Sequence, residues 1–144
     1  MFRGNHPTKI DGSGRLKLPV DHREVVDAQY GSDFFITSLD GKVIEIWPMK
    51  EWEQIEAQLA EKDASEEKAA FLEAVNYWGQ VVKFDSAGRL LLPQDLREHS
   101  GVTGDVAVVG LQRYLQVRSK DEQQAQLVAK PVTLADVARL GIRK

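Results

Sequence analysis

The sequence predicts a mainly β protein with flanking helices, an α+β fold in which one structural unit occurs twice. The first observation is a repeated phrase. DGSGRLKLPVDHRE begins at Asp11, and DSAGRLLLPQDLRE begins 74 residues later at Asp85, with nine of fourteen positions identical. The second is a set of short β-branched segments separated by turn residues. The third is helical periodicity in the segment between the two copies.

Each copy continues past the repeated phrase and forms a unit of about 40 residues. Residues 33–47 follow the first copy and residues 105–118 follow the second, and their apolar positions align when one residue is deleted at the turn. In each unit two strand regions are expected to flank a short helix. A lone unit of this size would have a marginal core, so the two halves are expected to need each other or partner chains.

The second copy shows the local signals most clearly. Residues 80–84 predict a strand, DSAG predicts a turn, and RLLLP resumes as strand. A short helix is expected to begin at Pro93, whose missing N–H costs nothing in a first turn, and to end at Gly101. VAVVG and YLQVR then form a strand pair. In the first copy the matching turn contains Asp40-Gly41, a strong hairpin signal.

Helices are expected between the copies and at the C-terminus. Apolar residues recur at helical spacing in two runs, Met49, Trp52, Ile55 and Leu59, then Ala70, Phe71, Val75 and Trp78. The break between them holds Ser65, which with Lys68 gives half a capping signal. Thr133 and Asp136 resemble a capping box. The chain is therefore divided into a first repeat (5–50), a helical connector (51–79), a second repeat (80–122) and a C-terminal polar segment with a short helix (123–144).

The net charge of −3 argues at first against a nucleic-acid partner, which usually selects a basic surface. The distribution changes this interpretation, because residues 1–24 carry a net +2 and residues 51–68 carry a net −5. The acidity belongs to the connector, which is interpreted as a solvated outer face, and the repeated phrase is mildly basic.

Several classes of protein have no support in the sequence. The chain has no cysteine, which excludes disulfides and thiolate metal sites. No apolar run approaches the roughly 20 residues of a membrane span, and the N-terminus has no apolar signal region. No nucleophile elbow, P-loop or dinucleotide fingerprint is present, so we expect neither an enzyme nor a cofactor nor a small-molecule substrate.

The repeated phrase places its charges on one face of a strand. Alternation puts Leu16 and Leu18 on one face, expected to be core together with Leu90 and Leu92, and puts Arg15 and Lys17 on the other. Asp11 and Asp85 are expected to fix the loops by accepting backbone N–H bonds. The arginines either pair with nearby carboxylates or meet phosphates or guanine edges, beside Gly14 and Gly88 that allow a close approach.

These residues resemble the MraZ family of bacterial regulators, which are built from two SpoVT/AbrB-type domains. The resemblance rests on Met1-Phe2-Arg3-Gly4, on Trp52 and on the doubled motif, and it extends from Met1 to about Arg118. The motif residues are Asp11, Gly14, Arg15, Leu16, Pro19, Arg23 and Glu24 in the first copy, and Asp85, Gly88, Arg89, Leu90, Pro93 and Arg97 in the second.

The resemblance implies tandem AbrB-like swapped-hairpin repeats that interlock in a double-ψ-like barrel, with helices on the outside. It implies ring-shaped homo-oligomers in the cytoplasm, associated with the nucleoid. These would bind short direct repeats in double-stranded promoter DNA and mainly repress their own operon. Arg15 is the expected DNA contact, Arg89 its second-copy counterpart, and Arg3, Ser13, Gly14 and Lys17 the helpers. The family often has lysine where this chain has Ser13, which removes one charge from the loop.

The remaining candidates have simpler explanations. No two of His6, His22 and His99 share a metal-binding spacing, so no metal site is expected. The tryptophans are expected to pack in the core or an interface rather than stack on bases. Two alternatives stay open, an AbrB-type antitoxin that neutralises a toxin through a separate tail, and a purely structural ring that binds proteins through its outer helices.

Overall fold

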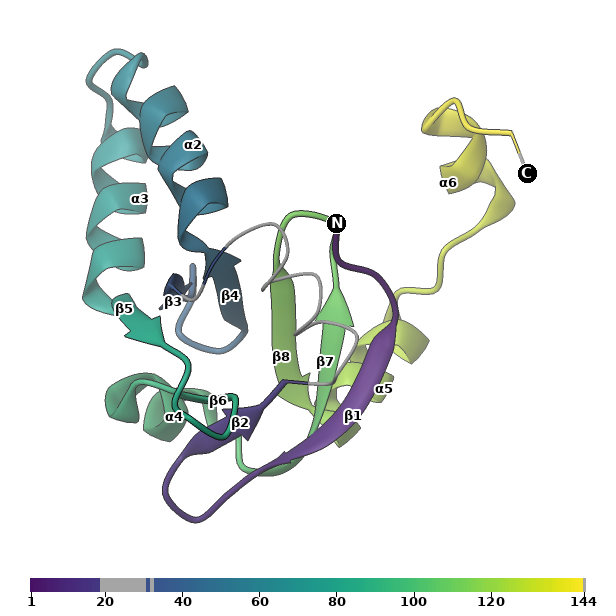
Figure 1. Cartoon of the computed structure of the whole chain (residues 1–144). Coiled ribbons are helices and arrows are strands. Elements are labelled where there is room, and N and C mark those ends of the chain that lie inside the picture. The colour runs from purple at the N-terminus through teal and green to yellow at the C-terminus, as the bar shows by residue number, and fades with distance from the viewer. Residues whose placement is uncertain (19–30, 32, 144) are drawn as a thin grey trace.

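The strands form one antiparallel sheet that curls into a nearly closed barrel, with helices on its outside (Figure 1). This fold is seen in a computed structural model, which describes residues 1–18, 31 and 33–143. The predicted short helix of the first copy, with Pro19, His22, Arg23 and Glu24, lies outside the described residues.

Eight strands make the sheet within the described part of the chain, in the order β5-β3-β4-β8-β7-β1-β2-β6. Their bounds are β1 Asn5–Ile10, β2 Arg15–Lys17, β3 Asp33–Thr37, β4 Ile44–Pro48, β5 Gln80–Lys83, β6 Arg89–Leu91, β7 Gly104–Gly110 and β8 Leu115–Ser119. The strands on either side of the DSAG turn and the hairpins of both copies are those that the sequence predicts.

The two repeats interlock through their strand pairing. The opening strand of each repeat lies against a later strand of the other: β1 pairs with β7 of the second repeat, and β5 pairs with β3 of the first. β2 pairs with β6, and β4 with β8, so the equivalent elements of the two copies meet twice. The expected swapped-hairpin barrel is confirmed. Neither half could close a core without the other.

The barrel interior is filled by the apolar faces of the strands. Leu16 and Leu90 are fully buried and lie opposite each other where β2 pairs with β6. The same cluster contains Leu18 and Leu92, as predicted, with Phe2 and aliphatic residues from β3, β4, β7 and β8. Burial of this apolar surface is the main favourable term in folding.

Helices α2 (Met49–Ala60) and α3 (Glu66–Tyr77) stand side by side on one side of the barrel (Figure 1). They cover a second, aromatic cluster. Trp52 is buried and stacks on Phe35 of β3 at 4.8 Å, and Trp47 stacks on Tyr114 at 4.4 Å. The prediction that these tryptophans pack is confirmed. The acidic residues of the connector are exposed, except Glu51, whose side chain is 15% exposed and pairs with Arg113 at 2.7 Å.

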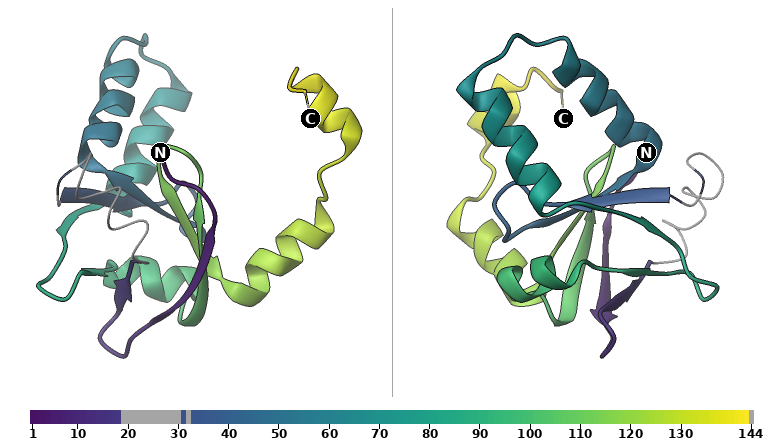
Figure 2. Two further views of the ribbon diagram at one scale, coloured as in Figure 1. Left: turned by 45° about the vertical axis from the view of Figure 1, so that its right-hand side comes forward. Right: turned by 90° about the vertical axis from the view of Figure 1, so that its left-hand side faces the viewer.

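Three shorter helices complete the described chain. They are α4 (Gln94–Ser100), α5 (Lys120–Ala129) and α6 (Leu134–Arg139). α4 begins one residue after Pro93 and ends at Gly101, whose φ of 69° is the left-handed conformation expected of a C-terminal glycine. The capping box of Thr133 and Asp136 is present at α6. Figure 2 shows α6 standing apart from the barrel. Within the described ranges no helix is long and apolar enough to cross a membrane.

The interior and exterior of β6 offer a direct test of the core. Leu90→Ala is expected to lower the free energy of unfolding by about 2–5 kcal/mol, because Leu90 is fully buried where the two repeats meet. Leu91 is 42% exposed on the opposite face, so Leu91→Ala should cost much less. Urea denaturation followed by circular dichroism compares the two. Equal reductions in the free energy of unfolding would contradict the assignment of the core.

Candidate nucleic-acid interface

The two glycine-arginine loops lie side by side because β2 and β6 pair. In this antiparallel ladder Arg15 lies opposite Leu91, and Lys17 lies opposite Arg89. Residues at opposed positions project to the same face of a sheet. The pairing therefore gathers three cations, one from each end of the first strand and one from the second, on the outer face of the barrel.

The first loop is fixed by the carboxylate of Asp11. One carboxylate oxygen, Oδ1, accepts the backbone N–H groups of Ser13 at 2.9 Å and Arg15 at 3.0 Å, and the Ser13 hydroxyl at 2.6 Å. The backbone closes the same turn, since the N–H of Gly14 donates to the carbonyl of Asp11. The guanidinium of Arg15 donates to the Ser13 hydroxyl at 3.0 Å. Ser13 thus connects the carboxylate to the arginine.

The second loop repeats this backbone arrangement, and here the arginine also forms an ion pair with the aspartate of its own loop. The Oδ1 atom of Asp85 accepts the N–H groups of Ala87 and Arg89, each at 2.9 Å, and the N–H of Gly88 donates to the carbonyl of Asp85. Arg89 donates its Nε to Oδ2 of the same aspartate at 3.0 Å. Both aspartates thus accept backbone N–H groups of their own loops.

Ion pairs also cross between the two loops. Arg89 Nη1 lies 3.2 Å from Asp11 Oδ2, and Arg15 Nε lies 3.6 Å from Asp85 Oδ2. Each arginine thus contacts the aspartate of the other repeat, so the loops are oriented together. The side chains of Arg15 and Arg89 keep 36% and 40% of their surface exposed, and they remain accessible to a ligand above the face.

The loop geometry holds both aspartates in the charged form. The hydrogen bond from the Ser13 hydroxyl, followed by that from the Arg15 N–H, lowers the pKa of Asp11 from 3.8 to about 2. The pKa of Asp85 is lowered mainly by the N–H of Arg89. Both carboxylates therefore stay ionised near neutral pH and keep the arginines in place.

Two features of the fold favour glycine at position 14. Its φ is +85°, and a Cβ atom added there would lie 2.2 Å from the guanidinium carbon of Arg97. Arg97 reaches this loop from α4 of the other repeat and donates its Nε to the carbonyl of Leu92 at 3.0 Å. Leu92 in turn donates its backbone N–H to the carbonyl of Gly14. Arg97 belongs to the motif in the sequence, but no contact is predicted for it there. The same position is arginine in both copies of the phrase, and this repetition is the sequence signal that could have indicated a contact for Arg97.

Arg3 is not brought to the loops within one chain. It lies where Phe2 bridges Gln112 and where its backbone approaches Gly110, at the opposite end of β1 from Asp11. The six residues of β1 separate these ends by about 20 Å. Among the described residues no group of three His, Cys, Asp or Glu side chains could hold a metal ion.

The fold and the paired loops define a class of protein, the two-repeat swapped-hairpin barrels that present glycine-arginine loops from both halves on one face. Comparison with known sequences is more specific. The family model described as "MraZ protein, putative antitoxin-like" matches residues 1–74 and 79–133. The chain belongs to the MraZ family.

Curated relatives can be aligned with this protein over nearly the whole chain. A protein of Acidobacterium capsulatum named transcriptional regulator MraZ is 53% identical over 98% of this chain and 97% of its own length. A protein of the same name from Koribacter versatilis is 43% identical, with the same two coverages. Another from Syntrophobacter fumaroxidans is 32% identical over 88% of this chain and 84% of its own length.

Gly14 and Gly12 give a matched pair of loop variants. Gly14→Ala is expected to lower the free energy of unfolding by about 1–3 kcal/mol, because the new side chain meets Arg97 and a positive φ is strained for alanine. A Cβ atom at Gly12 meets nothing within 4 Å, so Gly12→Ala should have little effect. Thermal unfolding distinguishes them. An unaffected Gly14→Ala protein would contradict the packing of Arg97 against this loop.

Acid titration tests the Asp11 network. A folded-state pKa of about 2 lies below the usual 3.8, so the carboxylate contributes stability above pH 3.8 that is lost as the pH falls through about 2. In Asp11→Asn the dependence of stability on pH over this range should be shallower. Carboxyl ¹³C NMR of the folded protein gives the midpoint directly. A midpoint near 3.8 would show that the network does not hold the charge.

Proposed function

We propose that this protein is a sequence-specific transcriptional regulator that binds double-stranded DNA through the paired loops. The observation that carries the proposal is the placement of Arg15 and Arg89 side by side, held by the carboxylates of Asp11 and Asp85 and partly exposed. The name of the curated relatives, transcriptional regulator, supports the same function.

The chemistry of the face suits DNA. An arginine fork matches the two acceptors of guanine in the major groove, or two phosphate oxygens, with bidentate hydrogen bonds. Loops that are fixed before binding lose little conformational freedom on association. Arg15 and Arg89 are assigned to base or phosphate contacts, and Lys17 to a phosphate. Ser13 supports Arg15, whereas Gly14 and Gly88 are buried and shape the loops. Asp11 and Asp85 shape the loops.

Arg3 has a different place in the proposal. Because it lies at the far end of β1, it would contact DNA well away from the loops of its own chain, or next to the loops of a neighbouring copy. The contribution of Arg3 to DNA binding therefore depends on how the copies of the chain are arranged, whereas that of Arg15 does not.

The function includes a homo-oligomer, expected to be a ring, that binds several short promoter repeats together. One face contributes few charges, and the whole chain is acidic, so single contacts would be weak. When several weak sites belong to one assembly, binding of the first raises the effective concentration of the others at the DNA, and the overall affinity increases strongly. The proposed setting is the cytoplasm, on the nucleoid, with repression of the protein's own operon. One isolated DNA repeat should bind far less tightly than several in phase.

A second candidate has one observation in its favour, the antitoxin-like description of the matching family. In that function the barrel would still bind DNA, and a separate segment would neutralise a toxin. Co-purification of a small partner protein with the tagged chain would support it. Its absence, together with binding to upstream DNA, would leave regulation as the simpler function.

The loop arginine gives the decisive variant. Arg15→Ala is expected to weaken binding to the DNA upstream of the gene by about 1–3 kcal/mol for each base-reading arginine that is truncated. Arg139, an exposed arginine on α6 away from the loops, supplies the control, and Arg139→Ala should bind as the wild type does. Fluorescence anisotropy with upstream and scrambled DNA measures both. Unchanged preference for upstream DNA in Arg15→Ala would refute the assignment.

A further inference from the structure

The cations Arg15, Lys17 and Arg89 lie on the outer face of the β2–β6 ladder, and the sheet register places further lysines next to them on one side of the barrel only. β2 pairs with β1 through Ile10 and Leu16, so the next step of the antiparallel register places Lys17 opposite Lys9. The hydroxyl of Thr8 donates to the carbonyl of Lys17 at 3.5 Å, which confirms that these segments are adjacent. Lys9 in turn lies opposite Asp105 of β7.

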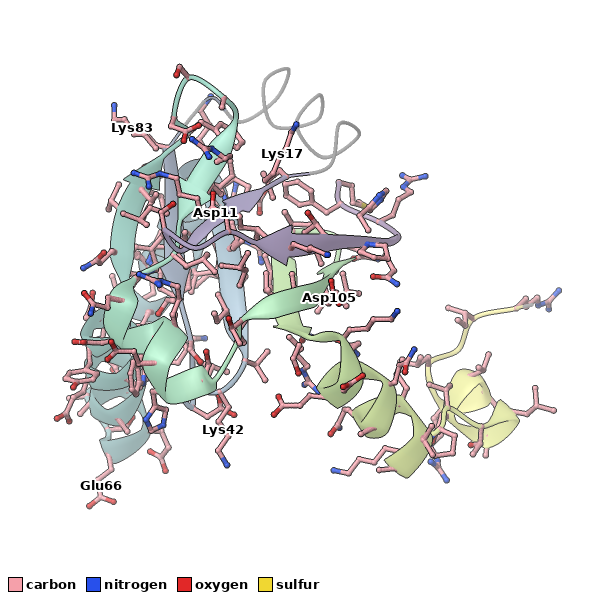
Figure 3. All side chains as sticks on the ribbon, turned by 90° about the horizontal axis from the view of Figure 1, so that it is seen from below. Asp11, Lys17, Lys42, Glu66, Lys83 and Asp105 are labelled. Carbon is pink, nitrogen blue, oxygen red and sulfur yellow. The ribbon has the colours of Figure 1, made fainter. Side chains whose placement is uncertain are left out.

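The row continues to the start of α5. Val106 of β7 pairs with Ser119 of β8, and the next step places Lys120 beside Asp105. A shallow groove is lined by these side chains together with Pro7, Thr8 and Val106. Figure 3 shows Lys17 and Asp105 on either side of β1. With Arg89, which lies opposite Lys17, the row crosses four neighbouring strands, and these are spaced about 4.8 Å apart.

The equivalent row on the other side of the barrel is much less basic. Arg15 occupies the place of Arg89, but Leu91 replaces Lys17 and Met49 replaces Lys120. Lys83 and Asp33 correspond to Lys9 and Asp105, and they form an exposed ion pair at 3.3 Å. The first row therefore carries four cations and one aspartate, and the second carries two cations and one aspartate.

The ion pair in the first row does not neutralise its charge. Lys9 Nζ lies 3.8 Å from the Asp105 carboxylate, with the two side chains 80% and 65% exposed. Exposed pairs of this kind are weak, and water screens them. Lys9 can therefore exchange Asp105 for a stronger anion.

We propose that the row formed by Arg89, Lys17, Lys9 and Lys120 binds the phosphate backbone of the DNA, and that the duplex consequently leaves the paired loops toward β1 and α5. This inference rests on the proposed function. It adds Lys9 and Lys120 as phosphate contacts, and it predicts on which side of the paired loops the duplex continues. Such contacts position the protein on the duplex and carry no sequence information.

Salt dependence tests the proposal with a matched internal control. Lys9→Gln and Lys120→Gln should each reduce the slope of log K against log salt by about 0.9 for every protomer bound to DNA, and preference for upstream over scrambled DNA should persist. Lys83→Gln removes the equivalent charge from the other side and should leave the slope unchanged. Asp105→Asn should tighten binding to both DNAs.

The outcomes separate this inference from the proposed function. If the wild type shows no preference for upstream DNA, the proposed function fails. If the preference is present but Lys9→Gln and Lys120→Gln keep the wild-type slope, only the row is refuted. If Lys83→Gln reduced the salt slope as much as Lys9→Gln does, the proposal that DNA follows only the first row would be wrong. Thermal melts show that the variants fold, which is expected because all three lysines are exposed.

Discussion

The antiparallel pairing of β2 with β6 is the contact on which the rest of the structure depends. It buries Leu16 against Leu90 on the inner face, and on the outer face it brings each loop arginine to the aspartate of the other repeat. Core closure and loop orientation are therefore consequences of one ladder. A single copy of the repeated phrase would supply neither, which gives a physical reason for the duplication.

The distribution of charge reconciles an acidic chain with a polyanionic ligand. The most acidic segment, residues 51–68 with a net charge of −5, covers most of α2 and the start of α3, which stand on one side of the barrel. The paired loops lead into β2 and β6 at its opposite end (Figure 1). At physiological salt, exposed charges separated by more than about 8 Å are largely screened from one another. The local excess of cations, and not the net charge of −3, thus governs what the face can bind.

Much of the fold is predictable from the sequence because it depends on short-range patterns. Alternation predicts the burial of Leu16 and Leu90, helical periodicity predicts α2 and α3, and the capping box of α6 is visible in Thr133 and Asp136. The contact of Arg97 with Gly14 is not predictable in this way, because it joins residues 83 positions apart through the strand exchange. The basic row is likewise a product of register between distant strands. The domain boundaries and the DNA-contact residues stay predictions.

The most direct test of a single DNA-binding face is a double-mutant cycle on Arg15 and Arg89, read as affinity for the DNA upstream of the gene. If the two loops form one coupled surface, each single substitution to alanine also releases the aspartate that both arginines share, Asp85. The reductions in binding free energy should then be non-additive, with a coupling energy of at least about 0.5 kcal/mol. Reductions that sum within error would show that the loops act independently and would contradict a single DNA-binding face built by the pairing of β2 with β6.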